Sequence, residues 1–177
     1  MQIEKTDLKF DADKLIEIYE SLEDPFRPNK QICFSSRGKD DFDDGIGSIY
    51  DYHPATELDW DHINPLFKGT YLEEVYNKLS TKYKLGRARF MRMDESMRAL
   101  SYHYDEGLRL HIPLITNPHS WFILEDETLY KMSEPGTLYV LDANKYHSAL
   151  NLSRQNLPRV HIVISTPGDT SEVSHHG

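Results

Sequence analysis

The sequence has 177 residues, of which 38% are hydrophobic and 28% are charged, a length and balance typical of one domain with its own core. No apolar run approaches the ~18 residues that crossing a bilayer requires, so we expect no membrane partner. The formal net charge of −9 argues against nucleic-acid binding, which needs a cationic surface. A single cysteine, Cys33, and an N-terminus without a secretory signal indicate a reducing, cytoplasmic location.

The N-terminal part, residues 1–86, predicts two helices joined by irregular chain. Apolar residues recur at helical spacing over residues 11–22, where an aspartate is available as the N-cap, and again over residues 71–83. Between the two helices, residues 31–37 indicate a short strand, and the acidic, glycine-bearing residues 38–47 predict a solvated surface loop.

From Arg87 onward the pattern changes to strands. Short runs rich in β-branched and aromatic residues, separated by Asn-Pro, Pro-Gly and polar turns, predict strands at 88–93, 99–105, 108–116, 120–125, 127–132, 136–142, 147–153 and 159–166. This spacing predicts a mostly β fold with flanking helices, arranged as a jelly roll or barrel. We therefore expect a single domain over residues 1–177, with a jelly-roll core at 87–166 and a polar tail at 167–177.

The main chemical signal is an H-x-D triplet, His103 and Asp105, inside one predicted strand. Side chains two residues apart on a strand share a face, so both point into one cavity. His147 follows a later strand that antiparallel pairing can bring beside them. Two histidines and one carboxylate leave metal positions open, as in non-haem Fe(II) oxygenases, whereas a structural zinc site is closed by four protein ligands. The set predicts a catalytic metal site.

Arg159 adds a co-substrate to this prediction. It lies in the last predicted strand, after His147, where its side chain can enter the same cavity. A buried guanidinium is a natural bidentate partner for the distal carboxylate of 2-oxoglutarate, whose other end would chelate the metal beside O₂. His161 shares the strand parity of Arg159, and we expect it to be a buried histidine satisfied by a neighbour, outside the site.

Two runs within residues 87–165 resemble the aspartyl/asparaginyl β-hydroxylase family, which includes free-proline hydroxylases. The runs are RFMRMDESMRALSYHYDEGLRLHIPLITNP and MSEPGTLYVLDANKYHSALNLSRQNLPRVHIVI. The resemblance implies a double-stranded β-helix, the cupin-like jelly roll, that binds Fe(II) and 2-oxoglutarate. It also implies insertion of one oxygen atom from O₂ into a C–H bond of an amino acid, free or peptidyl, with succinate and CO₂ as co-products.

The resemblance also assigns residues position by position. It implies iron binding by three side chains and 2-oxoglutarate binding by a fourth, namely His103, Asp105, His147 and Arg159. The triplet at residues 109–111 is similar to the family's R-x-H motif, which implies substrate contact for Arg109 and co-substrate contact for His111. From the residues alone, His111 is equally a structural, hydrogen-bonded histidine, and both interpretations stay open.

Two functions of other classes also fit the sequence. One is a cupin-like metal enzyme that does not use 2-oxoglutarate, in which Arg159 would serve the substrate. The other is a non-catalytic barrel that binds a small carboxylate, although a pure binder has no need of three metal ligands. Four arginines near the expected mouth favour a substrate with a carboxylate, namely Arg89, Arg92, Arg98 and Arg109.

Overall fold

Antiparallel strands are the main secondary structure of the computed structural model, which describes residues 1–24 and 27–168. In chain order the strands and α-helices are β1 (Ile3–Lys9), α1 (Ala12–Leu22), β2 (Gln31–Cys33), β3 (Ser35–Ser36), β4 (His62–Ile63), α2 (Tyr71–Ser80), β5 (Ala88–Met93), β6 (Leu108–Ile115), β7 (Ser120–Ile123), β8 (Leu129–Tyr130), β9 (Thr137–Asp142), β10 (Ser148–Asn151) and β11 (Arg159–Thr166). The prediction of a mostly β fold with flanking helices is confirmed. Residues 169–177 of the predicted tail lie outside the described residues.

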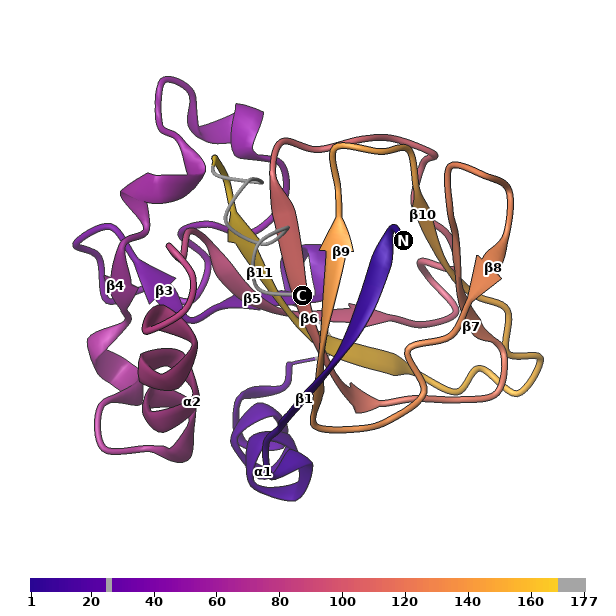
Figure 1. Cartoon of the computed structure of the whole chain (residues 1–177). Coiled ribbons are helices and arrows are strands. Elements are labelled where there is room, and N and C mark those ends of the chain that lie inside the picture. Colours follow the sequence, from indigo (N-terminus) through magenta and orange to yellow (C-terminus); the bar gives the residue numbers. More distant parts are fainter. Residues whose placement is uncertain (25–26, 169–177) are drawn as a thin grey trace.

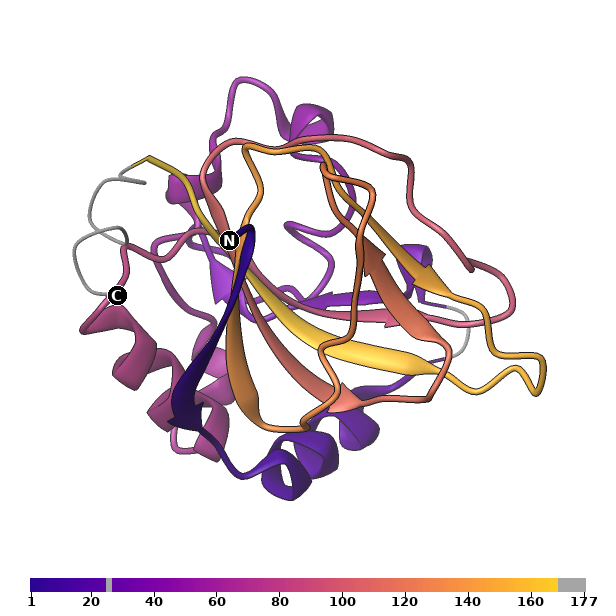
Figure 2. The same ribbon diagram turned by 45° about the vertical axis from the view of Figure 1, so that its right-hand side comes forward.

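Two sheets face each other. Six strands follow the order β1-β9-β6-β11-β5-β2, and three follow the order β10-β7-β8, while β3 and β4 pair separately. Figures 1 and 2 show the smaller sheet standing opposite the larger one, with α1 and α2 on the larger sheet's other side. Both edge strands of the large sheet come from the N-terminal part, so residues from both halves of the chain build one sheet.

The two-residue period of a strand gives the large sheet two different faces. In β6, Leu110 and Ile112 face the helices, whereas Arg109 and His111 face the smaller sheet. The helix-facing side forms the main core with α1 and α2, through the buried residues Leu15, Tyr19, Leu72, Val75, Leu79, Phe90, Leu110, Ile112, Val140 and Ile162. The opposite side carries the polar side chains, so the pleat sends them into the space between the sheets.

The two predicted helices are present, with small differences at their ends. Asp11 is the N-cap of α1, and its side chain accepts a hydrogen bond from the Lys14 amide at 3.2 Å. α2 ends at Ser80 rather than at the predicted Tyr83. The amides of Lys82 and Tyr83 both donate to the Leu79 carbonyl, which closes the last turn and ends the helix there.

The predicted strand at residues 99–105 is wrong. This segment forms only isolated bridges, of which one pairs Ala99 with Leu150 and the other pairs His103 with His147. The side chains of Tyr102 and Tyr104, which alternate with that of His103, are exposed. With isolated bridges alone, the segment does not continue the sheet.

The acidic loop 38–47 is exposed over residues 38–41, as expected, but its end is buried and anchored. Asp44 is buried and accepts two hydrogen bonds of 2.8 Å from Arg37. Its backbone carbonyl accepts a third from the Trp60 indole at 2.9 Å. Gly45 has a φ of +119°, and a Cβ there would lie 2.6 Å from the Cys33 sulfur, so only glycine fits. The end of the loop is therefore fixed against the sheet.

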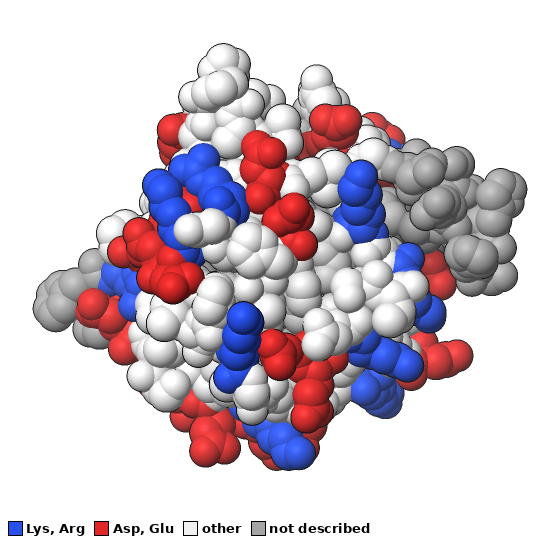
Figure 3. All heavy atoms as spheres, turned by 90° about the vertical axis from the view of Figure 1, so that its left-hand side faces the viewer, with Lys and Arg blue, Asp and Glu red and all other residues white. Residues whose placement is uncertain are grey.

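Acidic and basic side chains are interspersed on the face around β3, β4 and α2 (Figure 3). This distribution leaves no wide single-sign patch on that face. Within residues 1–24 and 27–168, no helix combines the length and the apolar character that a membrane crossing needs.

Candidate metal centre and its cavity

His103, Asp105 and His147 converge, as the sequence predicted. One potential ligand atom from each lies within 4.8 Å of the others. His103 and His147 face each other because their backbones form a two-way bridge, with N–H to O distances of 3.0 and 2.8 Å. Asp105 is held two residues further on by its amide, which donates to the Ala143 carbonyl at 2.8 Å. In the described part of the chain, this is the group of His, Cys, Asp and Glu residues that could hold a metal ion.

Backbone carbonyls fix the tautomers of both histidines. His103 Nδ1 lies 2.6 Å from the Ser101 carbonyl oxygen, and His147 Nδ1 lies 2.9 Å from that of Lys145. A carbonyl oxygen can only accept, so each Nδ1 carries the proton and donates. The lone pair of each neutral ring is then on Nε2, as expected for metal-binding histidines oriented by a second partner.

The three groups also set one another's charge. Burial alone would raise the pKa of Asp105, but the hydrogen bond to His103 and the charge of Arg109 lower it to about 2. The same hydrogen bond, 3.5 Å between Nε2 and Oδ2, raises the pKa of His103 against the opposing effect of burial. Burial lowers the pKa of His147. Asp105 is therefore ionised at neutral pH and burial favours the neutral ring of His147, while a divalent cation would take the place of the proton that Asp105 favours on His103 Nε2.

The three residues open into a cavity of about 1010 Å³ between the two sheets. Its walls include side chains of the large sheet, of the small sheet and of residues 47–58. A volume of this size is ample for a small-molecule ligand together with a metal ion.

Arg159 lies on the same cavity wall, at the start of β11, and its residue is only 3% exposed. Its guanidinium lies 5.3 Å from the centre of the Phe122 ring, and no described carboxylate lies within ion-pair distance of it. Burial lowers the pKa of Arg159 to about 9. A buried cation without a counter-charge is costly, so this end of the cavity favours an anionic ligand.

Two histidines extend the Arg159 site. Arg159 Nη2 lies 2.9 Å from His161 Nδ1, and because a guanidinium can only donate, His161 accepts there. His111 Nδ1 lies 3.2 Å from the same His161 nitrogen and must therefore be the donor. Burial, reinforced by nearby positive charge, holds the pKa of both histidines well below the usual value. The network fixes Arg159 in place through neutral rings.

The structure brings together all six residues that the sequence singled out. Three of them, His103, Asp105 and His147, are called the metal set below. These three and Arg109, His111 and Arg159 all line the cavity. Arg109 and His111 lie on the same face of β6, whose pairing with β11 is regular over both. Arg109 also contacts the metal set, with Nη2 3.4 Å from the Asp105 carboxylate.

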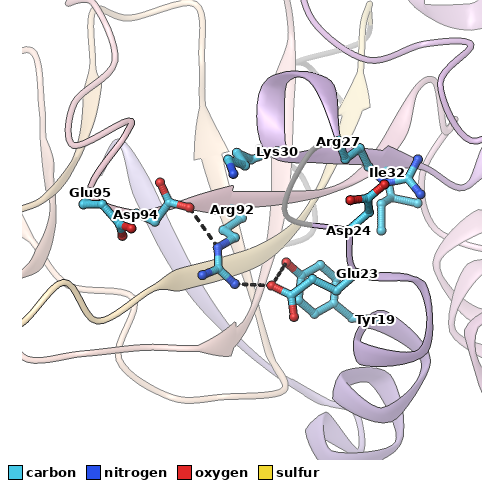
Figure 4. Close-up of a pocket in the computed structure, with 9 residues that line it drawn as sticks. All are labelled: Tyr19, Glu23, Asp24, Arg27, Lys30, Ile32, Arg92, Asp94 and Glu95. Carbon is cyan, nitrogen blue, oxygen red and sulfur yellow. Dashed lines mark hydrogen bonds and ion pairs between the residues drawn. The ribbon is translucent and has the colours of Figure 1, made fainter.

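Two of the four arginines expected near the mouth lie elsewhere, which corrects that prediction. Arg92 faces a separate pocket, where it pairs with Glu23 and with Asp94 (Figure 4). Arg98 donates to the Ser153 carbonyl and to the Asn156 side chain, away from the cavity. Strand parity separates Arg92 from Arg89, because residues three apart on β5 face opposite ways.

The sequence did not identify three residues that line the cavity, namely Gln31, Glu57 and Phe122. His161 is buried and hydrogen-bonded to its neighbours, as expected, and its contact with Arg159 places it beside the site. Gln31 and Glu57 had no usable signal in the sequence, because they enter the cavity from segments whose place depends on tertiary packing.

A family model described as aspartyl/asparaginyl beta-hydroxylase matches residues 69–167. The match covers more than half of the chain, including the metal set and Arg159, and it begins at α2, earlier than the sequence resemblance at residue 87. A search of curated proteins found no match. Together with a three-residue group that could hold a metal ion in one cavity, the match shows that this chain belongs to the aspartyl/asparaginyl beta-hydroxylase family of hydroxylases.

Proposed function

We propose that this protein is an Fe(II)- and 2-oxoglutarate-dependent dioxygenase that hydroxylates an amino acid or an amino-acid side chain. The observation that carries the proposal is the pairing of an open three-ligand group with an uncompensated buried arginine in one cavity. The first supplies a place for a metal with free positions, and the second supplies a place for the far carboxylate of a 2-oxo acid.

His103 Nε2, His147 Nε2 and the Asp105 carboxylate would hold the iron. Both Nε2 lone pairs are directed away from the carbonyls that hold Nδ1, and the carboxylate is ionised at neutral pH, so the donor set fits a divalent metal. When bound, Fe(II) supplies the coupling of O₂ reduction and 2-oxo acid decarboxylation to oxidation of a substrate C–H bond.

Arg159 would pair with the distal carboxylate of 2-oxoglutarate. Its fixed position on β11, with His161 on one side and the Phe122 ring on another, keeps the guanidinium oriented before the ligand arrives. An oriented donor loses little entropy on binding, so the site gains affinity. We assign His111 to the same subsite, where it borders the co-substrate and holds His161.

Arg109 would contact the substrate beside the metal. Its side chain is 9% exposed and its Nη2 lies 3.4 Å from the Asp105 carboxylate, so it reaches the same space as the proposed metal ligands. A cation at this position also keeps Asp105 ionised and ready to bind metal.

The fold supports the same assignment. Two opposed antiparallel sheets with a polar cavity between them are consistent with a double-stranded β-helix, and we propose this architecture for one domain spanning residues 1–177. The buried free thiol of Cys33 and the Fe(II) requirement are consistent with a reducing, cytoplasmic setting.

Release of succinate tests the proposal against the cupin-like alternative. Protein loaded with Fe(II) is supplied with O₂, 2-oxoglutarate and a mixture of free amino acids, and succinate is quantified by NMR. We expect succinate from the wild type and at least a 100-fold lower rate from His103→Ala. His62→Ala is the matched control, because His62 is an exposed histidine paired with Asp61 outside the cavity. Iron binding without succinate would contradict the proposal and favour the cupin-like enzyme.

A further inference from the structure

Arg89 is a second buried cation in the cavity. It lies in β5 and is 7% exposed, and it lines the same cavity as the metal set. Its Nη1 donates to the Gln31 side-chain oxygen at 3.1 Å and to the Gly47 carbonyl at 3.0 Å. Both acceptors are neutral, so the positive charge of Arg89 has no direct counter-charge there.

The bonding capacity of Arg89 is also incomplete. Its Nε is buried and has no hydrogen-bond partner, and no described carboxylate lies within 4.0 Å of its guanidinium. Leaving a buried donor unpaired costs free energy, more so when the donor carries charge. A carboxylate ligand would satisfy both deficits at once.

Other arginines nearby are already neutralised. Arg87 makes a two-pronged ion pair with Glu57, at 2.7 and 2.9 Å, and Arg109 contacts Asp105. In the neighbouring pocket, Arg92 lies between Glu23 and Asp94 (Figure 4). Among the described arginines that line the main cavity, Arg89 and Arg159 are left without a carboxylate partner.

The two unpaired arginines are held at separate places on the cavity wall, Arg159 by His161 and Arg89 by Gln31 and the Gly47 carbonyl. On β11, Arg159 is opposite Met93 of β5, whereas Val163 is opposite Arg89. Their anchor points are thus separated by four strand positions, roughly 13 Å at the rise of a β-strand. If 2-oxoglutarate occupies the Arg159 end, Arg89 remains available for a different anion.

We infer that Arg89 forms a second carboxylate subsite, which binds the substrate, and that the substrate is a small molecule with a free carboxylate. This inference rests on the proposed function, which assigns Arg159 to the co-substrate. The subsite lies on β5, where Arg89 is 7% exposed and donates to the Gly47 carbonyl, so the carboxylate that pairs with it must be buried in the cavity. Free amino acids and other small acids fit inside the cavity of about 1010 Å³, and they are the substrates that the inference names.

The test uses two substitutions with opposite effects on the protein's own contacts. Arg89→Gln removes the cation. Gln31→Glu keeps the oxygen that accepts from Arg89 at 3.1 Å and from the Gly47 amide at 2.9 Å. The new carboxylate neutralises the charge of Arg89, which then no longer needs a ligand's carboxylate. Arg92→Gln is the matched control, because it changes an arginine on the same strand that faces the other pocket.

Calorimetry on anaerobic protein measures binding of free L-amino acids and small carboxylic acids, each alongside its carboxamide. Titrations are made with Fe(II) and 2-oxoglutarate present and repeated without them. We expect at least one acid to bind the wild type and its amide to bind at least about tenfold more weakly. Arg89→Gln and Gln31→Glu should each lose at least tenfold in affinity for that acid, while Arg92→Gln and the affinity for 2-oxoglutarate stay within about twofold.

Three results would overturn the inference. They are the absence of binding by every acid, equal binding of acid and amide, and retention of acid affinity in Gln31→Glu. If Arg89 is purely structural, Gln31→Glu should retain its affinity for the acid, since this substitution strengthens the native contact between Arg89 and residue 31. Failure of 2-oxoglutarate to bind the wild type would instead sink the proposed function, and the titrations without 2-oxoglutarate would still decide whether Arg89 binds a carboxylate.

Discussion

Asp105 and His103 form a coupled pair, and this coupling predicts a measurable pKa. Because the Asp105 hydrogen bond is the largest influence raising the pKa of His103, Asp105→Asn should bring that pKa down toward 6.5 or below. Histidine ring signals followed by NMR across a pH titration of metal-free protein measure the change. Asp61→Asn, which removes the partner of the exposed His62, should leave His103 unaffected.

The raised pKa of His103 also determines how the stability of the metal-free protein depends on pH. Because the pKa of His103 is raised in the folded state, the pair stabilises metal-free protein fully below the unfolded histidine pKa, and this stabilisation is lost as pH rises through the folded pKa. It is lost again at strongly acidic pH, where Asp105, with a pKa of about 2, takes up a proton. Metal binding has the opposite sign, because Fe(II) competes with the proton on His103 Nε2. Iron affinity should therefore fall as pH drops through a value above 6.5, and an unchanged affinity down to pH 6 would contradict the coupling.

Replacing Arg159 should affect stability and ligand binding in opposite ways. It is buried beside Phe122 with no described carboxylate partner, so replacing it with an apolar side chain removes a desolvation cost. We expect Arg159→Met to leave the free energy of unfolding unchanged or raise it by about 1 kcal/mol in urea without 2-oxoglutarate. Affinity for 2-oxoglutarate should fall at least 100-fold. Destabilisation by more than about 2 kcal/mol would indicate that Arg159 is mainly structural.

Two residues of the metal set could be predicted from local sequence, and the third, His147, from the expected antiparallel pairing. His103 and Asp105 are two residues apart, and residue types with that spacing limit the possible ligands. The distinction between Arg89 and Arg92 depends instead on which carboxylates lie nearby after folding. Glu23, which pairs with Arg92, is far away in sequence, so counting charges could not separate a free cation from a neutralised one.

At the scale of elements, the N-cap of α1 gives a direct test of how the helix begins. Asp11→Ala removes the side-chain acceptor for the Lys14 amide and should lower the free energy of unfolding by about 1 kcal/mol. Asp13→Ala, two residues further on, removes a charge without breaking a described cap bond. It should lower the free energy of unfolding by less than half as much. Equal losses in chemical denaturation would show that charge, not capping, determines the start of the helix.

Elements with a strong apolar period could be predicted, and elements determined by pairing could not. β5, β6, β9 and β11 have alternating or continuous apolar runs and appear close to their predicted bounds. β1 was missed because it is an edge strand of mostly polar residues, with only Ile3 buried. The strand predicted at residues 99–105 was wrong for the opposite reason. Its composition suits a strand, but the segment pairs only through isolated bridges.

For the whole molecule, the pairing of early and late strands predicts that the chain unfolds as one unit. β1 pairs with β9, and β2 pairs with β5, so neither half completes the large sheet alone. Trp60 lies in the first half and Trp121 in the second. Single-tryptophan variants, Trp121→Phe and Trp60→Phe, should report coincident urea transitions.

Removal of residues 1–86 gives the complementary test. The remaining strands would expose the apolar face that α1 and α2 cover, including Leu110 and Ile162. We expect the fragment to aggregate or to lack a cooperative transition. A fragment that unfolds cooperatively and still binds Fe(II) would show that the N-terminal part is dispensable for the fold.

The most direct test of the proposed function is an anaerobic titration of Fe(II)-loaded protein with 2-oxoglutarate, followed by visible absorption. Chelation of Fe(II) by a 2-oxo acid gives a weak charge-transfer band and needs no substrate. We expect a single charge-transfer band from the metal site, and we expect His103→Ala to abolish it. With Arg159→Met, the band should appear only at a 2-oxoglutarate concentration at least 100-fold higher. Binding of iron without any band would contradict the account, because the metal and Arg159 would then not share a 2-oxo acid.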